Sequence, residues 1–102
     1  MHIREFQKLI ERLYLAKDSA RGSEKSFMWF VEEVGELAEA LRGGGKNELE
    51  CEFADVLAWL STLASMKGVD LERAVSKYAR GCPVCKKIPC ACEEKSFFEE
   101  KS

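Results

Sequence analysis

The chain has few residues that break helices and no apolar stretch long enough to cross a membrane. Only two of its 102 residues are proline, Pro83 and Pro89, so the first four-fifths of the chain is free to be helical. No segment approaches the roughly 18 consecutive apolar residues of a transmembrane helix. The first residues also lack the apolar run of a signal peptide, and we therefore expect a cytoplasmic protein.

A strong charge of one sign is also missing. Sixteen basic residues against 18 acidic ones give a net charge of −2, whereas domains that bind nucleic acid are usually strongly basic. We expect no nucleic-acid polymer and no membrane among the partners. The period-two alternation of a half-exposed strand and internal repeats are absent as well.

Four amphipathic segments predict an all-α, bundle-like fold. Apolar residues recur at helical spacing along residues 3–20, 23–41, 47–66 and 71–80. Ser23 is expected to cap the second helix and Asp70 the fourth. Three glycines at 43–45 are expected to end the second helix in the left-handed conformation, and so short a loop predicts that helices two and three are antiparallel. The predicted core stripes are Ile3, Phe6, Ile10 and Leu13; Phe27, Phe30, Val31, Val34, Leu37, Ala38 and Leu41; and Leu49, Phe53, Val56, Leu57, Leu60, Leu63 and Ala64.

Acidic residues are paired at the same spacing on both central helices. Glu33 and Glu36 are three residues apart, and Glu52 and Asp55 repeat that interval on the next helix. If the pairs face each other, four carboxylates repel one another until a cation joins them. Hard oxygen ligands favour Mg²⁺ or Mn²⁺ over zinc.

Asp55 carries most of this interpretation. A run of glutamates on a helix is usually a solvated face, but Asp55 is the only charged residue between Phe53 and Ala64. A buried acid needs a partner, because an unpaired buried charge is costly. That partner is either a metal or an Arg or Lys from the first or fourth helix, and the spacing alone leaves both open.

The motif Glu32-Glu33-x-x-Glu36, followed on the next helix by Glu52-x-x-Asp55, resembles the signature of MazG-type nucleotide pyrophosphohydrolases, a branch of the all-α NTP pyrophosphatase superfamily. The resemblance covers roughly residues 1–80. It implies Mg²⁺-dependent cleavage of a nucleoside triphosphate between the α and β phosphates, giving a monophosphate and pyrophosphate in house-cleaning or nucleotide-pool control. It also implies a homodimer or a dimer of dimers.

The resemblance further assigns roles to residues. It implies that Glu33, Glu36, Glu52 and Asp55 hold the metal and that Glu32 orients or deprotonates the attacking water, with Glu36 and Glu39 as less favoured bases. Lys77 and Arg80 are the preferred phosphate contacts, because family members commonly place basic residues on the last helix. Other cations are Lys17, Arg21, Lys25, Arg42 and Lys46. Trp29, away from the apolar stripe, is expected to stack on the base or to anchor a dimer interface, and Trp59 is the other stacking candidate.

A second kind of site follows residue 80. Cys82, Cys85, Cys90 and Cys92 form a Cys-x₂-Cys-x₄-Cys-x-Cys pattern, which favours a closed, structural zinc site. Disulfides, an iron–sulfur cluster and redox thiols are the alternatives. Cys51 is expected to be an ordinary helix residue. We therefore predict a catalytic domain at 1–80 and a cysteine-rich turn with a charged tail at 81–102.

Two other functions remain open at this point. A zinc-pinned helical module could bind a partner without catalysis, with Phe97 and Phe98 docking on it. A regulatory relative could bind nucleotide without hydrolysing it. Base and sugar preference depend on the shape of a pocket that the motif does not define.

Overall fold

The computed structural model describes residues 1–93, so the predicted docking of Phe97 and Phe98 lies outside the described residues. The chain divides into two compact units, Met1–Glu72 and Arg73–Ser102, and each is described by itself. The predicted boundary between residues 80 and 81 stays a prediction.

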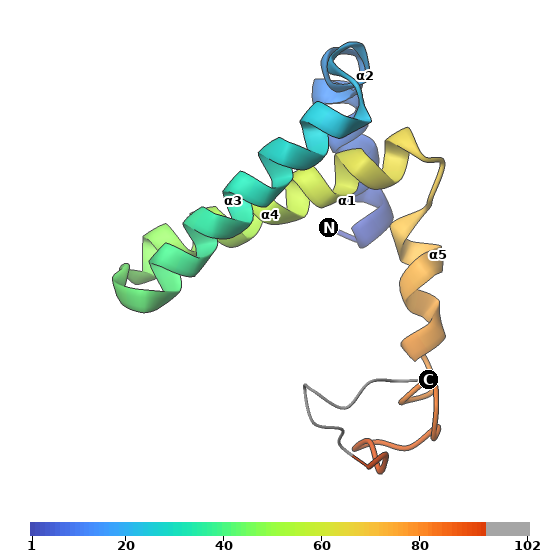
Figure 1. The fold of residues 1–102 in the computed structure, drawn as a ribbon. Coiled ribbons are helices and arrows are strands. Elements are labelled where there is room, and N and C mark those ends of the chain that lie inside the picture. The colour runs from blue at the N-terminus through green and yellow to red at the C-terminus, as the bar shows by residue number, and fades with distance from the viewer. Residues whose placement is uncertain (94–102) are drawn as a thin grey trace. The chain divides into compact units, whose positions relative to one another are not determined.

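The first unit is built on an antiparallel pair of long helices. Helix α3 (Ser23–Gly43) and helix α4 (Lys46–Met66) lie side by side along their lengths, joined by the glycine turn (Figure 1). The first helical segment runs as α1 (Ile3–Ile10), a π-helical turn η1 (Glu11–Leu15) and α2 (Ala16–Arg21). It contacts α4 through α1 and η1, and α3 through α2.

The fourth predicted helix is shorter than expected. It consists of α5 (Leu71–Val75) and a 3₁₀ turn η2 (Ser76–Tyr78). Residues 1–93 contain no strand, so the all-α prediction with four helical segments is confirmed. Within the described part of the chain, no helix combines the length and hydropathy that crossing a membrane requires.

The helix ends correct two expectations. Gly22, with φ of 98°, occupies the cap position of α3, and Ser23 is already the first helical residue. Gly44 ends that helix in an extended conformation (φ −82°), so the turn does not use the left-handed geometry. A glycine at position 44 lets the turn approach the end of α3, because a Cβ there would lie only 3.0 Å from the Ala40 carbonyl oxygen. Asp70 does cap α5, accepting a hydrogen bond from the Glu72 amide at 3.0 Å.

Polar side chains form much of what one copy buries. Ile10 and Ala40 are its buried apolar residues in the described part, beside five buried polar ones: Gln7, Asp18, Ser26, Ser61 and Thr62. Gln7 ties α1 to the start of α5. Its amide nitrogen donates to the Val69 carbonyl at 2.8 Å and to Ser65 Oγ at 3.0 Å, and its oxygen accepts from the Leu71 amide at 2.8 Å.

The apolar stripes predicted as core are largely exposed in one copy. Leu13 is 57% exposed. Residues of the predicted stripes on both long helices are 40% to 61% exposed: Phe27, Val31, Val34 and Leu41 on α3, and Phe53, Leu57 and Leu60 on α4. The apolar residues do recur along these helices as predicted, but the surface that they form is not buried inside a single chain. An apolar surface this continuous is typical of an interaction face.

Candidate functional site

Three of the four predicted metal ligands converge between the long helices. Carboxylate oxygens of Glu33 and Glu36 on α3 and of Glu52 on α4 all lie within 4.8 Å of one another. Opposite ligands of an octahedral Mg²⁺ are separated by about 4.2 Å, twice the usual bond length. Small rotations of these side chains therefore suffice to enclose the ion.

The electrostatics of this cluster favour a cation. Burial, followed by the charge of Glu36, raises the pKa of Glu33, and the same two causes in the same order raise the pKa of Glu52. One oxygen of each, Glu33 Oε1 and Glu52 Oε1, is buried without a hydrogen-bond partner. Unpaired buried carboxylate oxygens are costly, and a divalent cation of oxygen-preferring character satisfies both. The donor set therefore fits Mg²⁺ or Mn²⁺.

Asp55 lies beside this cluster and is not one of its three converging residues. Its charge helps to raise the pKa of both Glu33 and Glu52. In the described part of the chain it forms no ion pair with an Arg or Lys, and the Cys51 thiol lies 3.9 Å from its Oδ2. It is half-buried. Its role as a fourth ligand stays a prediction.

A cleft of about 370 Å³ opens next to Glu33 and Asp55. Its lining comes from all three helical segments of the first unit: Tyr14, Lys17, Asp18, Arg21, Glu33, Asp55, Ala58, Trp59 and Thr62. The four from the first segment are spaced as one helix face. The cleft thus joins acidic residues to two cations, Lys17 and Arg21, that the sequence ranked behind Lys77 and Arg80.

The two tryptophans connect this cleft to the neighbouring surface. Trp29 stacks on Trp59, with ring centroids 6.4 Å apart and planes 9° from parallel. Trp29 also lines a hollow of about 400 Å³ together with Lys25, Met28 and Glu32. Glu32, the predicted base, is exposed there, next in sequence to the cluster residue Glu33.

Asp18 is a site residue that the sequence did not indicate. It is 4% exposed, and it accepts hydrogen bonds from Arg21 Nη1 at 2.7 Å and from Thr62 Oγ1 at 2.9 Å. The guanidinium of Arg21 in turn lies 5.3 Å from the centre of the Trp59 ring. The sequence did contain one signal of this contact. Ser61 and Thr62 are neighbours in sequence that interrupt the apolar run of α4, and such a polar pair indicates a buried polar partner on another helix.

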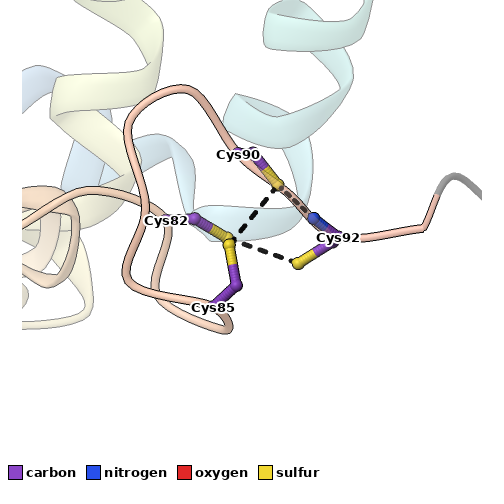
Figure 2. A group of neighbouring side chains, drawn as sticks. All are labelled: Cys82, Cys85, Cys90 and Cys92. Atoms are coloured by element: carbon purple, nitrogen blue, oxygen red, sulfur yellow. Dashed lines mark hydrogen bonds between the residues drawn. The ribbon is translucent and has the colours of Figure 1, made fainter.

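The second unit holds the four cysteines of the predicted zinc turn. Sulfur atoms of Cys82, Cys85, Cys90 and Cys92 lie within 4.8 Å of one another, and Figure 2 shows them turned toward a common centre. Gly81, with φ of 107°, begins the turn, and a Cβ there would lie 2.9 Å from Ile88. Lys77 and Arg80 also lie in this unit, exposed.

Backbone amides point at several of these sulfurs. The Val84 amide lies 3.4 Å from Cys82 Sγ, the Ala91 amide 3.3 Å from Cys85 Sγ and the Cys92 amide 3.3 Å from Cys90 Sγ. Amide donors from Cys85 and Val84 lower the pKa of Cys82 to about 6, whereas the neighbouring sulfurs raise the pKa of Cys92 to about 12. Some of the thiols therefore ionise easily, while others resist adding a further negative charge next to them. A soft divalent cation would stabilise all four as thiolates, so the four cysteines fit such an ion.

A carboxylate cluster between antiparallel helices, beside a cleft with cations and aromatic rings, is typical of metal-assisted hydrolysis of phosphate bonds. The comparisons with known proteins agree with this class. The model of the MazG nucleotide pyrophosphohydrolase domain matches residues 21–86, more than half of the chain and all of the predicted carboxylates, and the chain belongs to this family.

The chain is also similar to a curated protein. The chain is 34% identical over 70 residues to the histidine biosynthesis bifunctional protein HisIE of Aquifex aeolicus (strain VF5). That match covers 69% of this chain, and the chain spans about a third (34%) of the length of that relative.

Proposed function

We propose that this protein is a Mg²⁺- or Mn²⁺-dependent nucleoside triphosphate pyrophosphohydrolase that releases a nucleoside monophosphate and pyrophosphate, in house-cleaning or nucleotide-pool control in the cytoplasm. The observation that supports it best is the convergence of Glu33, Glu36 and Glu52 with two unpaired buried oxygens. Family membership supports the reaction class.

Each part of the reaction has a candidate group. Glu33, Glu36, Glu52 and Asp55 would hold the cation, which would supply positive charge against the phosphates and polarise a phosphoryl oxygen. Glu32 accepts the proton of the attacking water. The water oxygen forms a bond to the α-phosphorus. The bond from the α-phosphorus to the oxygen that bridges it to the β-phosphorus breaks, and pyrophosphate leaves with that electron pair. Lys17 and Arg21 contact the phosphates from the cleft, with Lys77 and Arg80 as further candidates, and Trp29 stacks on the base.

The test of this function is pyrophosphate release from a panel of ribo- and deoxyribonucleoside triphosphates, with and without Mg²⁺ or Mn²⁺. We expect at least one substrate to give equimolar monophosphate and pyrophosphate only when metal is present. Tight nucleotide binding without turnover would instead identify a regulatory relative. Absence of both would leave the binding-module hypothesis.

The raised pKa values of Glu33 and Glu52 predict how pH changes the effect of metal. The folded metal-free protein binds more protons than the unfolded chain, so its stability falls as pH rises from the ordinary glutamate value of 4.5 through the raised values. Metal binding removes that loss. With Mg²⁺ at one fixed concentration, about 100-fold above its Kd at pH 8, the melting temperature should rise by about 10 °C near pH 8 and much less near pH 5, where protons compete for the carboxylates. An equal rise at both values measured by differential scanning fluorimetry would contradict this.

The exposed stripes of α3 and α4 support a homodimer or dimer of dimers. A second copy would cover Val31, Val34, Leu57 and their neighbours, which are 40–50% exposed. We expect light scattering to give at least twice the 11.6 kDa chain mass. Leu57→Glu should shift the assembly to monomer, because it places a charge in an apolar interface. Glu50→Gln, at an exposed position on the same helix, is the control. A wild-type monomer at micromolar concentration would contradict the proposal.

The cysteine turn is proposed to hold structural zinc. Four converging sulfurs with amide donors aimed at them support this proposal, because four thiolates would leave zinc no open coordination position. Iron with inorganic sulfide, or disulfides, would be found instead if the alternatives were correct.

A further inference from the structure

We propose that Asp18 is a positioning residue, which holds the guanidinium of Arg21 at the wall of the cleft so that its remaining donors face an anionic phosphate group of the substrate. The phosphate role of Arg21 rests on the proposed function. The assignment of Asp18 comes from the contacts of the two residues.

Arg21 is held in place on more than one side. Its Nη1 donates to Asp18 Oδ1 at 2.7 Å and lies 3.5 Å from Ser26 Oγ, and its guanidinium lies over the Trp59 ring at 5.3 Å. Among the described residues, both of these hydrogen bonds use Nη1. The donors on Nε and Nη2 therefore stay available to a ligand, and a guanidinium offers five donors in all.

Asp18 is itself fixed from the opposite helix. Its second oxygen accepts a hydrogen bond from Thr62 Oγ1 at 2.9 Å, so the carboxylate is anchored to α4 while it holds an arginine on α2. The side chain of Asp18 is only 6% exposed, against 24% for Arg21. The carboxylate is thus buried behind the guanidinium, and Arg21 presents the accessible part of the pair.

The position of the pair explains why such a costly arrangement is useful. Arg21 and the carboxylates Glu33 and Asp55 line the same cleft, so a phosphate group there meets Arg21 and lies beside the proposed metal site. An acid next to a phosphate-binding arginine weakens its attraction for anions. The gain must therefore lie in orientation, because a fixed guanidinium loses less conformational freedom on binding than a mobile one.

A merely structural role makes a different prediction. If Asp18 only pins the first helical segment to α4, its loss lowers stability and affects every function alike. If Asp18 acts through Arg21, its loss weakens phosphate binding only while Arg21 is present. The two roles are separated by a double-mutant cycle.

The probe is inorganic pyrophosphate with Mg²⁺, measured by calorimetry on the full-length protein, beside KM and kcat for any triphosphate that is turned over. We expect Asp18→Asn and Arg21→Ala each to weaken pyrophosphate binding by about 10- to 100-fold, the range of a hydrogen bond to a charged group. The double variant should be no weaker than Arg21→Ala. KM should rise with kcat nearly unchanged. Arg12→Ala, an exposed arginine on the same helical segment, is the matched control.

Thermal unfolding checks that each variant is folded. If Asp18→Asn does not fold, Thr62→Val replaces it in the cycle, since it frees the second oxygen of Asp18 and should weaken binding by about 2- to 10-fold only when Arg21 is present. Wild-type pyrophosphate affinity in Asp18→Asn and Arg21→Ala overturns the proposal. So does a loss of affinity on replacing Asp18 that is equally large with and without Arg21. So does a wild-type protein that does not bind pyrophosphate. Pyrophosphate binding that follows the cycle without turnover of any triphosphate supports the role of Asp18 and refutes the proposed activity alone.

Discussion

Glu36→Gln should lower pyrophosphate release by more than about 100-fold, because loss of even an outer partner of a metal ligand commonly costs about 10- to 100-fold. Glu36 is the exposed member of the three-carboxylate cluster, so its replacement changes charge without disturbing a buried contact. An amide keeps the shape of the side chain but contributes no negative charge to hold the cation. Steady-state turnover at saturating Mg²⁺ measures the effect, and calorimetric titration with Mn²⁺ should show weaker metal binding in the same variant.

Glu32→Gln separates the base from the ligands. Loss of a general base typically lowers turnover by about 10²- to 10⁴-fold, while Mn²⁺ binding should stay close to that of the wild type. Glu50→Gln, an exposed glutamate on α4, should retain both properties. Unchanged turnover in Glu36→Gln would contradict the metal assignment, and unchanged turnover in Glu32→Gln would contradict only the assignment of the base.

Cys85→Ser should abolish the zinc binding that we propose for the second unit. Structural zinc typically supplies about 10–16 kcal/mol of apparent binding free energy near neutral pH, and the four sulfurs here have few apolar contacts to replace it, since Val84 and Ile88 are 81% exposed. We expect zinc content measured by atomic emission to fall from one ion per chain to near zero, and the segment from residue 73 to residue 93 to become sensitive to protease.

The fifth cysteine provides the control for that experiment. Cys51 lies on α4 and outside the four-sulfur group, so Cys51→Ser should keep the zinc. Full zinc content in Cys85→Ser, or iron and sulfide in the purified wild-type protein, would show that the proposed zinc site is wrong.

The sequence predicted those features that depend on periodicity within one helix. The four helical segments follow from apolar spacing, and the convergence of Glu33, Glu36 and Glu52 follows from two acidic pairs on adjacent antiparallel helices. The cysteine cluster was predictable because its four cysteines lie within eleven residues of one another in sequence.

Features that depend on contacts between segments were missed. The π-helical turn at Glu11–Leu15 has no sequence signal that we can identify. In the same helical segment Leu13, which was predicted for the core, is exposed, whereas Asp18 is buried. In the sequence, Asp18 looks like an ordinary surface residue. Its burial depends on its contacts with Arg21 and Thr62, and Thr62 comes near it only in the folded chain.

The apolar stripes show a different limit. Phe53, Leu57 and Leu60 recur as a core face should, and yet each is more than 40% exposed in one copy. Periodicity shows that a face is to be buried but does not say whether the same chain or a second copy buries it. The proposed dimer accounts for that difference.

The most direct test of the account is ³¹P nuclear magnetic resonance of the products formed from a triphosphate that the wild-type protein consumes with Mg²⁺. The account predicts equal amounts of nucleoside monophosphate and pyrophosphate, with neither formed when the metal is chelated or when Glu36 is replaced by glutamine. Diphosphate and inorganic phosphate as products, or the same product yield without metal, would contradict the claim that this carboxylate cluster is the centre of a pyrophosphohydrolase.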